Sequence, residues 1–157
     1  RLITRRVAPA LMRKGFDGLF LDNVDMVETH PGRRAGMRVL VRTLARGREL
    51  LFAQNGEGFE GGLARYLDGW NREDVTSTYD FGRRSYTRTS AQARRDAQAE
   101  LRRMAARGLL VTATDYVAAG DSAGESDSVA GACAAGALPY VADIGLTRVP
   151  ASPFTCP

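Results

Sequence analysis

Carboxylates recur at the ends of short apolar runs in this sequence, and this recurrence limits the folds open to it. Asp22, Glu73 and Asp115 each stand at or just beyond such a run. Short apolar runs without alternating polar residues are typical of parallel strands buried on both faces. Acids gathered where parallel strands end are typical of the face on which α/β barrels carry out their chemistry. The sequence therefore predicts an α/β fold whose chemistry lies at the carboxyl ends of its strands.

Apolar periodicity and glycine positions divide the chain into alternating elements. Ser90 is a plausible helix N-cap and Gly108 a plausible helix end. The expected helices cover residues 2–14, 32–46, 60–65, 90–107 and 129–135, and the expected strands cover 17–22, 50–53, 66–70, 109–114 and 138–142. The segments 23–31, 54–59, 71–89 and 120–128 are expected to be loops. Five strands separated by helices or long loops predict βα units and a parallel sheet.

Composition excludes several classes of protein. The net charge is +4, but the arginines cluster in helix-like segments, where they are expected to be solvated, so no nucleic-acid partner is predicted. No apolar run approaches the roughly 18 residues of a membrane-spanning helix. The glycine-rich stretch 56–58 lacks the pattern of a phosphate-binding loop, and His30 is the sole histidine, so neither a cofactor nor a metal site is expected.

Two cysteines, Cys133 and Cys156, are too few for a disulfide scaffold or a zinc site. Either they form one bridge that ties the C-terminal tail to the last helix, or they are two unpaired thiols. A bridge would suit an exported protein.

Five stretches, in order, resemble motifs of glycoside hydrolase family 114, barrels related to endo-α-1,4-polygalactosaminidases. Gly15–Asp25 resembles the family's fourth-strand signature, and Asp68-Gly69 followed by Glu73 resembles its sixth-strand Asp-Gly-x-x-x-Glu. The other stretches are 54–56, 115–116 and 138–140, which resemble the ends of strands five, seven and eight. Residues 70–72 are bulkier and more polar than the family pattern, and the loop after Glu73 is long.

The resemblance implies a partial (β/α)8 TIM barrel, covering about strands 4 to 8, with parallel strands and outer helices. A complete barrel typically needs about 250 residues, whereas this chain has 157 and begins with Arg1. We therefore expect residues 1–157 to be a single domain, the C-terminal portion of a TIM-barrel glycoside hydrolase, with N-terminal strands 1–3 missing.

Glycosidic bond cleavage requires one carboxylic acid to protonate the leaving oxygen and a second carboxylate to attack the sugar or activate water. The resemblance places Asp22 and Glu73 at the ends of strands four and six, which fits two acids on opposite sides of the bond. Asp22 is expected to be the nucleophile and Glu73 the acid/base. The alternatives are a helix-capping role for Asp22 and a surface acid for Glu73.

Six further residues near strand ends are candidates for substrate binding, each with a structural alternative. They are Asp25, Asn55, Trp70, Asp115, Tyr116 and Tyr140. The alternative is a loop-structuring role for Asp25, a turn for Asn55, and core packing or structural support for the other four.

The resemblance implies a glycoside hydrolase that cleaves an α-1,4-linked galactosamine-type polysaccharide in an extracellular or cell-envelope setting. Acids at the strand ends would attract such an amino-sugar polymer. The alternatives are a non-catalytic sugar-binding or envelope-associated relative of the same barrel, or an inactive truncated fragment.

Overall fold

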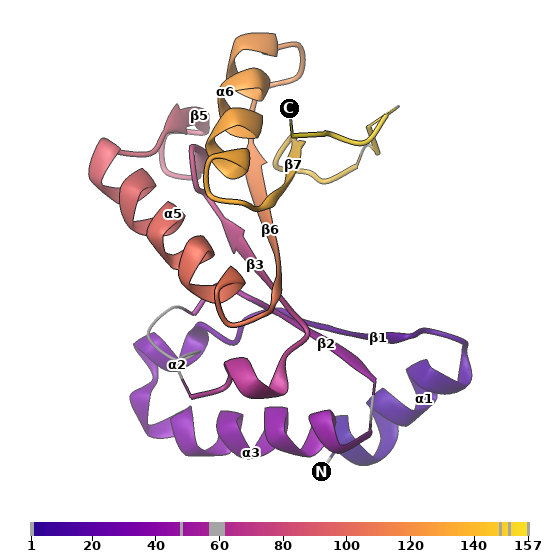
Figure 1. The fold of residues 1–157 in the computed structure, drawn as a ribbon. Coiled ribbons are helices and arrows are strands. Elements are labelled where there is room, and N and C mark those ends of the chain that lie inside the picture. The colour runs from indigo at the N-terminus through magenta and orange to yellow at the C-terminus, as the bar shows by residue number, and fades with distance from the viewer. Residues whose placement is uncertain (1, 48, 57–61, 148, 151, 157) are drawn as a thin grey trace. The chain divides into compact units, whose positions relative to one another are not determined.

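The computed structural model describes residues 2–47, 49–56, 62–147, 149–150 and 152–156 (Figure 1). Its main sheet has five strands in the hydrogen-bonding order β1-β2-β3-β6-β7, and a second sheet pairs β4 with β5. The chain divides into two compact units: unit 1 holds residues 1–70 and 107–109, and unit 2 holds residues 71–106 and 110–157. Strand β3 begins in unit 1 and ends in unit 2.

Unit 1 alternates short helices with parallel strands. Its strands β1 (Gly18–Leu21) and β2 (Leu50–Gln54) pair in parallel, with Gly18 opposite Leu50. The helical segments are η1 (Ile3–Val7), α1 (Ala8–Arg13), α2 (Met26–Thr29), η2 (Pro31–Arg33), α3 (Arg34–Leu44), η3 (Ala45–Gly47) and η4 (Ala64–Tyr66). The predicted helices over 2–14 and 32–46 and the predicted strands over 17–22 and 50–53 are confirmed to within a few residues.

One face of the β1–β2 pair is buried and the other is exposed. Leu51 and Ala53 are buried, as are Val41 and Leu44 of α3, which lies on one side of these strands in Figure 1. Because side chains alternate across a strand, the opposite face carries Phe20, which is 56% exposed. Apolar burial on one face only explains why these strands form a layer with α3.

Unit 2 holds the remaining elements. They are the end of β3 (Gly69–Glu73), β4 (Ser77–Asp80), β5 (Ser85–Arg88), α5 (Ala91–Ala105), β6 (Leu110–Tyr116), α6 (Ser122–Cys133) and β7 (Leu138–Ala142). Strands β6 and β7 pair in parallel over the whole length of β7, from Thr112 opposite Leu138 to Tyr116 opposite Ala142. The predicted last strand, 138–142, is confirmed.

Helix α5 forms where the sequence predicts it. The Ser90 hydroxyl accepts a hydrogen bond from the Ala93 N–H at 3.1 Å, which satisfies one free donor of the first turn. Gly108, just beyond the helix, has a φ of 87°, a left-handed conformation that glycine adopts without a steric penalty. Leu101 and Met104, on one side of the helix, are completely buried.

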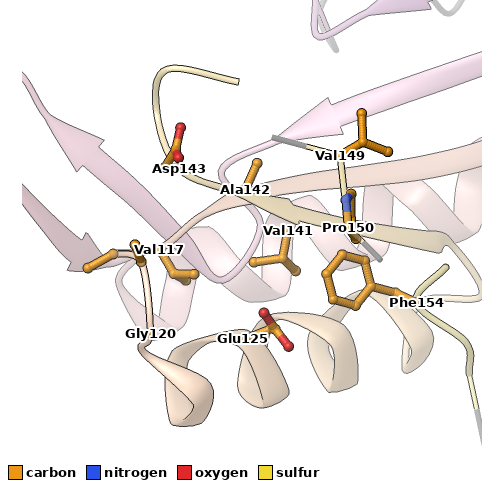
Figure 2. A pocket seen from close by; sticks show the side chains of 11 residues that line it. Val117, Gly120, Glu125, Val141, Ala142, Asp143, Val149, Pro150 and Phe154 are labelled. Carbon is orange, nitrogen blue, oxygen red and sulfur yellow. The ribbon is translucent and has the colours of Figure 1, made fainter. Parts of the chain in front are cut away.

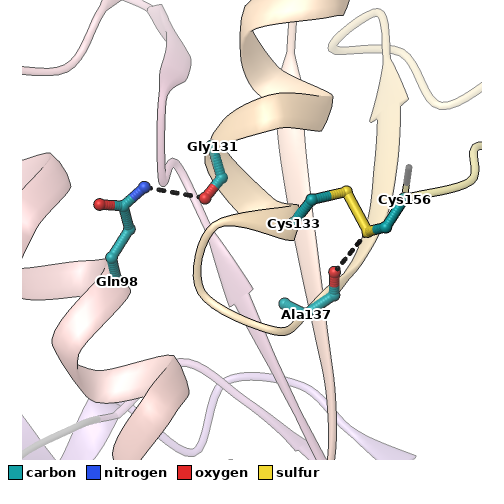
Figure 3. Close-up of a disulfide and its surroundings, with 5 residues drawn as sticks. All are labelled: Gln98, Gly131, Cys133, Ala137 and Cys156. Atoms are coloured by element: carbon teal, nitrogen blue, oxygen red, sulfur yellow. Dashed lines mark hydrogen bonds between the residues drawn. A yellow bond between two sulfur atoms is a disulfide. The ribbon is translucent and has the colours of Figure 1, made fainter.

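A disulfide between Cys133 and Cys156 ties the C-terminal tail to the end of α6 (Figure 3). The bridge is the first of the two alternatives that the sequence left open. On its other side, α6 is joined to α5 by a hydrogen bond from Gln98 Nε2 to the Gly131 carbonyl at 2.8 Å, also shown in Figure 3. Helix α6 is therefore fixed on both sides.

Two predicted boundaries around β3 are wrong. The strand covers 69–73 rather than 66–70, so Glu73 ends a strand instead of lying in a loop. The predicted loop over 71–89 contains the antiparallel hairpin β4–β5. The hairpin forms because Tyr79 and Tyr86 lie directly opposite each other, with ring centroids 5.0 Å apart, and cross-strand aromatic pairs stabilise such ladders.

The last predicted loop and helix are also wrong, because α6 begins at Ser122 and not at 129. Asp121 caps it by accepting a hydrogen bond from the Gly124 N–H at 2.8 Å. Small residues predict a helix poorly, but here they allow close packing: a Cβ on Gly131 would lie 2.1 Å from Thr76 Oγ1. Tertiary contact thus overrides local propensity.

The predicted loop over 23–31 contains the short helix α2, and β6 extends to Tyr116 rather than ending at 114. The predicted glycine-rich loop over 54–59 and the weak helix over 60–65 lie partly outside the described residues. Within the part of the chain that the structure describes, no helix has the length and apolar character needed to cross a membrane.

Candidate active site

Asp22 directly follows β1 in unit 1 and has an exposed side chain. Its Oδ1 atom accepts hydrogen bonds from the Asn23 N–H at 2.7 Å and from Gln54 Nε2 at 3.0 Å. Gln54 ends the neighbouring strand β2, which the parallel register brings beside the end of β1. An amide donor on β2 therefore orients a carboxylate that solvent can reach.

The other two loop candidates of unit 1 make backbone contacts. Asp25 is half-buried at the N-cap position of α2, but its side chain makes no capping hydrogen bond. Asn55 follows β2 with a φ of 53°, and its carbonyl accepts a hydrogen bond from the indole of Trp70 at 3.0 Å. The structure thus shows Asn55 in a tight turn beside Gly56, the alternative that its sequence also predicts.

Trp70 is completely buried, which corrects the expectation that it binds substrate. Neighbouring strand residues point to opposite faces, so Trp70 and Asn71 cannot both face the same side of the sheet. The Asn55 carbonyl satisfies the indole N–H, as a buried tryptophan requires. With no exposed ring face, Trp70 is a core residue of unit 1.

Glu73 is the last residue of β3 and is half-buried in unit 2. The hydroxyl of Tyr116, the last residue of β6, donates a hydrogen bond to Glu73 Oε1. Tyr116 is itself 6% exposed, so its ring is held firmly by packing. Two residues that the sequence singled out separately are thus brought together, and the phenol fixes the direction of the carboxyl group.

A polar ladder, absent from the sequence-based expectations, lies on the same strand face as Glu73. Asn71 Oδ1 accepts hydrogen bonds from Thr112 Oγ1 at 2.7 Å and from Thr114 Oγ1 at 3.1 Å. Thr112, Thr114 and Tyr116 alternate with buried residues along β6. This period-two pattern was visible in the sequence, but Asn71 was assigned to a loop and its place on a strand was missed.

Asp115 points away from this ladder, because it lies between Thr114 and Tyr116 on β6. It is 1% exposed, and its Oδ1 atom accepts hydrogen bonds from the backbone N–H groups of Thr76 at 2.9 Å and Ser77 at 3.1 Å. Burial raises the pKa of Asp115 to about 6, although these backbone donors lower it. Such burial leaves no surface for a sugar, so Asp115 is a structural acid rather than a ligand of substrate.

Asp74 is a second perturbed acid in the same turn. Burial raises its pKa, a hydrogen bond with Thr78 lowers it, and the charge of Glu73 raises it further. Its backbone N–H donates to the Thr114 carbonyl at 3.0 Å. Three carboxyl groups, at 73, 74 and 115, therefore border one short turn. Carboxyl groups with raised pKa values, such as those of Asp74 and Asp115, are common in functional sites.

Tyr140 lies in the middle of β7, directly opposite Thr114 in the register, and packs edge-on against Phe154 at 6.4 Å between ring centroids. A cavity of about 240 Å³ lies near the ends of β6 and β7 (Figure 2). Val117, Val141 and Phe154 form apolar walls, and Glu125 and Asp143 supply carboxylates. None of the predicted site residues lines it.

The two predicted catalytic acids belong to different units, Asp22 to unit 1 and Glu73 to unit 2. Each ends or follows a parallel strand and is oriented by a polar side chain from the next strand in the sheet order, Gln54 or Tyr116. Oriented carboxyl groups of this kind can donate a proton, accept one, or attack an electrophilic carbon. Among the described residues, no group of three or more His, Cys, Asp or Glu side chains is placed to hold a metal ion.

Comparison with known proteins leaves the family open and identifies the fold. No family model matches the chain, and no curated protein matches it. The glycoside hydrolase domain of PelA from Pseudomonas aeruginosa superposes with a TM-score of 0.77 at 21% identity, and the match covers 92% of this chain and 60% of that one. A glutamate-to-alanine variant of the same domain gives a TM-score of 0.76, with the same identity and coverage. The chain thus spans about 60% of the length of that domain, and its sheet and helices have the fold of part of a TIM-barrel-like glycoside hydrolase domain.

Proposed function

We propose that this chain forms part of a glycoside hydrolase that cleaves an α-1,4-linked galactosamine-type polysaccharide, with Asp22 and Glu73 as its two catalytic acids. The observation that supports this most directly is the Glu73 carboxyl group, held at the end of β3 by the Tyr116 hydroxyl in a fold like that of a glycoside hydrolase domain. The motif order in the sequence, which resembles family 114, supports the choice of substrate.

In this proposal Glu73 protonates the leaving glycosidic oxygen and Asp22 attacks the anomeric carbon. Gln54 then keeps the nucleophile oriented, and Tyr116 keeps the acid oriented. After the glycosyl-enzyme forms, Glu73 takes a proton from the attacking water, so each acid ends the cycle in its starting state. Orientation matters because a misplaced catalytic group can lower the rate by about 100-fold.

The proposed substrate class rests on charge as well as on resemblance. Partly deacetylated galactosamine polymers carry ammonium groups, which carboxylates attract. Exposed acids in the segments that follow strands include Asp22 directly after β1, Glu28 in α2 and Glu125 in α6. The disulfide between Cys133 and Cys156 supports a proposed extracellular or cell-envelope location, because such bridges persist in oxidising compartments.

The test is an assay of the complete gene product containing this chain on purified galactosamine polymers, with neutral and anionic polysaccharides as comparison substrates. Asp22→Asn and Glu73→Gln should each reduce oligosaccharide release by at least about 1,000-fold, since both carboxyl groups take part in bond cleavage. Asp96→Asn, which changes an exposed acid on α5, is the matched control and should retain full activity.

Each outcome has a distinct meaning. Release by the parent and by Asp96→Asn, with loss in both acid variants, supports a glycosidase and its two acids. Unchanged release in either acid variant removes that residue from the proposal. A folded parent that binds the polymer without cleaving it favours a non-catalytic sugar-binding role.

A further inference from the structure

The turn after Glu73 is held by a carboxylate that no substrate can reach. We propose that Asp115 is a positioning residue, which anchors the turn 74–77 and thereby holds Glu73 in place against Tyr116. This inference rests on the proposed function for its kinetic consequence, but the anchoring itself is independent of any activity. It gives the sequence-predicted substrate ligand Asp115 a different role.

The turn needs an anchor because its first residue is strained. Asp74 has a φ of 58°, in the left-handed region that costs a non-glycine residue roughly 1–2 kcal/mol. Such a conformation persists only where its surroundings enforce it. The Asp74 N–H bond to the Thr114 carbonyl at 3.0 Å is one restraint, and the bonds from Thr76 and Ser77 to Asp115 are two more.

The anchor continues into α6 and the segment before α5. Ser77 and Ser128 share a hydrogen bond between their hydroxyl oxygens at 2.8 Å, with both side chains buried. Thr89 Oγ1 donates to the Val75 carbonyl at 2.9 Å. Val75 is fully buried, so the turn is part of the core of unit 2 and not a surface loop.

Strand β6 therefore fixes Glu73 from two sides. On one face, Tyr116 contacts the carboxyl group of Glu73 directly. On the other face, Asp115 holds the backbone three and four residues beyond it. Asp115 and Tyr116 are adjacent in β6. Loss of the Asp115 contacts on one face should therefore displace Tyr116 on the other face.

Two substitutions separate anchoring from charge. Asp115→Ala removes the acceptor and leaves two buried N–H groups without a partner, whereas Asp115→Asn keeps a carbonyl oxygen in their reach. In Asp115→Ala, hydrogen exchange at the Thr76 and Ser77 amides should accelerate by at least about 10-fold, because each loses a buried hydrogen bond. Asp115→Asn should preserve most of the protection.

The link to Glu73 has its own readout, which needs no activity. The ¹³Cζ resonance of Tyr116, assigned with Tyr116→Phe, reports the phenol hydrogen bond to Glu73. It should move in Asp115→Ala but not in Glu100→Gln, a control that alters another buried acid of unit 2, paired with Arg103 on α5. A stationary resonance in Asp115→Ala, or amides that exchange no faster, would overturn the proposal.

Kinetics then distinguish this inference from the proposed function. Well below the melting temperature, Asp115→Ala should lower kcat by about 10- to 100-fold with little change in KM, as expected for a misplaced catalytic group. If Glu73→Gln is inactive while folded Asp115→Ala keeps full kcat, the positioning role is wrong and the function stands. If the parent cleaves nothing, the function fails, and the amide and Tyr116 measurements still decide the anchoring.

Discussion

Gly18 of β1 has no room for a side chain. A Cβ added to Gly18 would lie 2.3 Å from the Leu50 carbonyl oxygen, its neighbour across the parallel ladder. Because that neighbour is backbone, neither strand can yield without breaking the pairing. The close approach of these two strands at Gly18 therefore depends on the absence of a side chain.

We expect Gly18→Ala to lower the free energy of unfolding by about 1–3 kcal/mol, the usual cost of overpacking. Gly36→Ala is the matched control: Gly36 lies in α3 with nothing within 4 Å of its added Cβ. This control should raise stability by up to about 1 kcal/mol, because alanine is the better helix former. Urea unfolding of both variants measures the difference, and equal midpoints would contradict the expected clash.

The buried carboxyl group of Asp115 predicts a pH dependence of stability. Its pKa is raised from 3.8 to about 6 in the folded state. Between these values the folded protein keeps a proton that the unfolded chain has released, so the free energy of unfolding falls as pH rises. Asp115 alone accounts for a loss of about 3 kcal/mol across this window.

Asp115→Asn cannot ionise, so its unfolding free energy should fall less than that of the parent between pH 4 and 6.5. Buried Asp74 also has a raised pKa, so a smaller slope should remain in the variant. Urea unfolding at several pH values measures both slopes. Parallel curves for parent and variant would show that Asp115 does not titrate in this range.

At the scale of single elements, the disulfide joins the C-terminal tail covalently to α6. Cys133 and Cys156 are 23 residues apart. By lowering the conformational entropy of the unfolded chain, a bridge across a loop of this length stabilises the folded state by about 3 kcal/mol. Cys156→Ser should therefore lower the melting temperature of unit 2. A reductant should lower the parent's melting temperature to that of the variant and leave the variant's own unchanged; a parent that does not respond to reductant would contradict the bridge.

The sequence was informative about elements where one local signal dominates. Ser90 and Gly108 bound α5, and β7 lies where its apolar run predicts. It failed where tertiary contacts decide: the small residues of α6 form a helix because Gly131 allows close approach to Thr76. The hairpin was missed because its tyrosines pair only once the strands meet.

For the candidate site, the sequence identified the acids but could not give their surroundings. Glu73 and Tyr116 were singled out separately, and only the fold joins them. Asp115 and Trp70 were expected to bind substrate, yet both are buried. Both observed strands continue past the residue concerned, β3 to Glu73 and β6 to Tyr116, so Trp70 and Asp115 lie within strands and not at their ends.

At the scale of the whole molecule, each unit exposes large apolar side chains on its strands. Phe20 and Leu50 in unit 1 and Leu110 and Leu138 in unit 2 are all more than half exposed, at 56%, 52%, 51% and 55%. Contiguous exposed apolar surface promotes association. We expect the 157-residue chain, expressed by itself, to self-associate at micromolar concentration. Light scattering coupled to size exclusion measures this, and a monodisperse monomer would be the contrary result.

The hairpin β4–β5 has a consequence for how proteins of this kind can diversify. At its tip, Asp80 and Ser85 lie directly opposite each other, so the exposed residues 81–84 leave and re-enter the hairpin at almost the same place. An exposed excursion with adjacent ends can be lengthened, shortened or exchanged without moving the elements that flank it. Relatives could therefore acquire new preferences by exchanging this tip while keeping Glu73 and the Ser77 contacts that support it, and the tip is a natural boundary for grafting experiments.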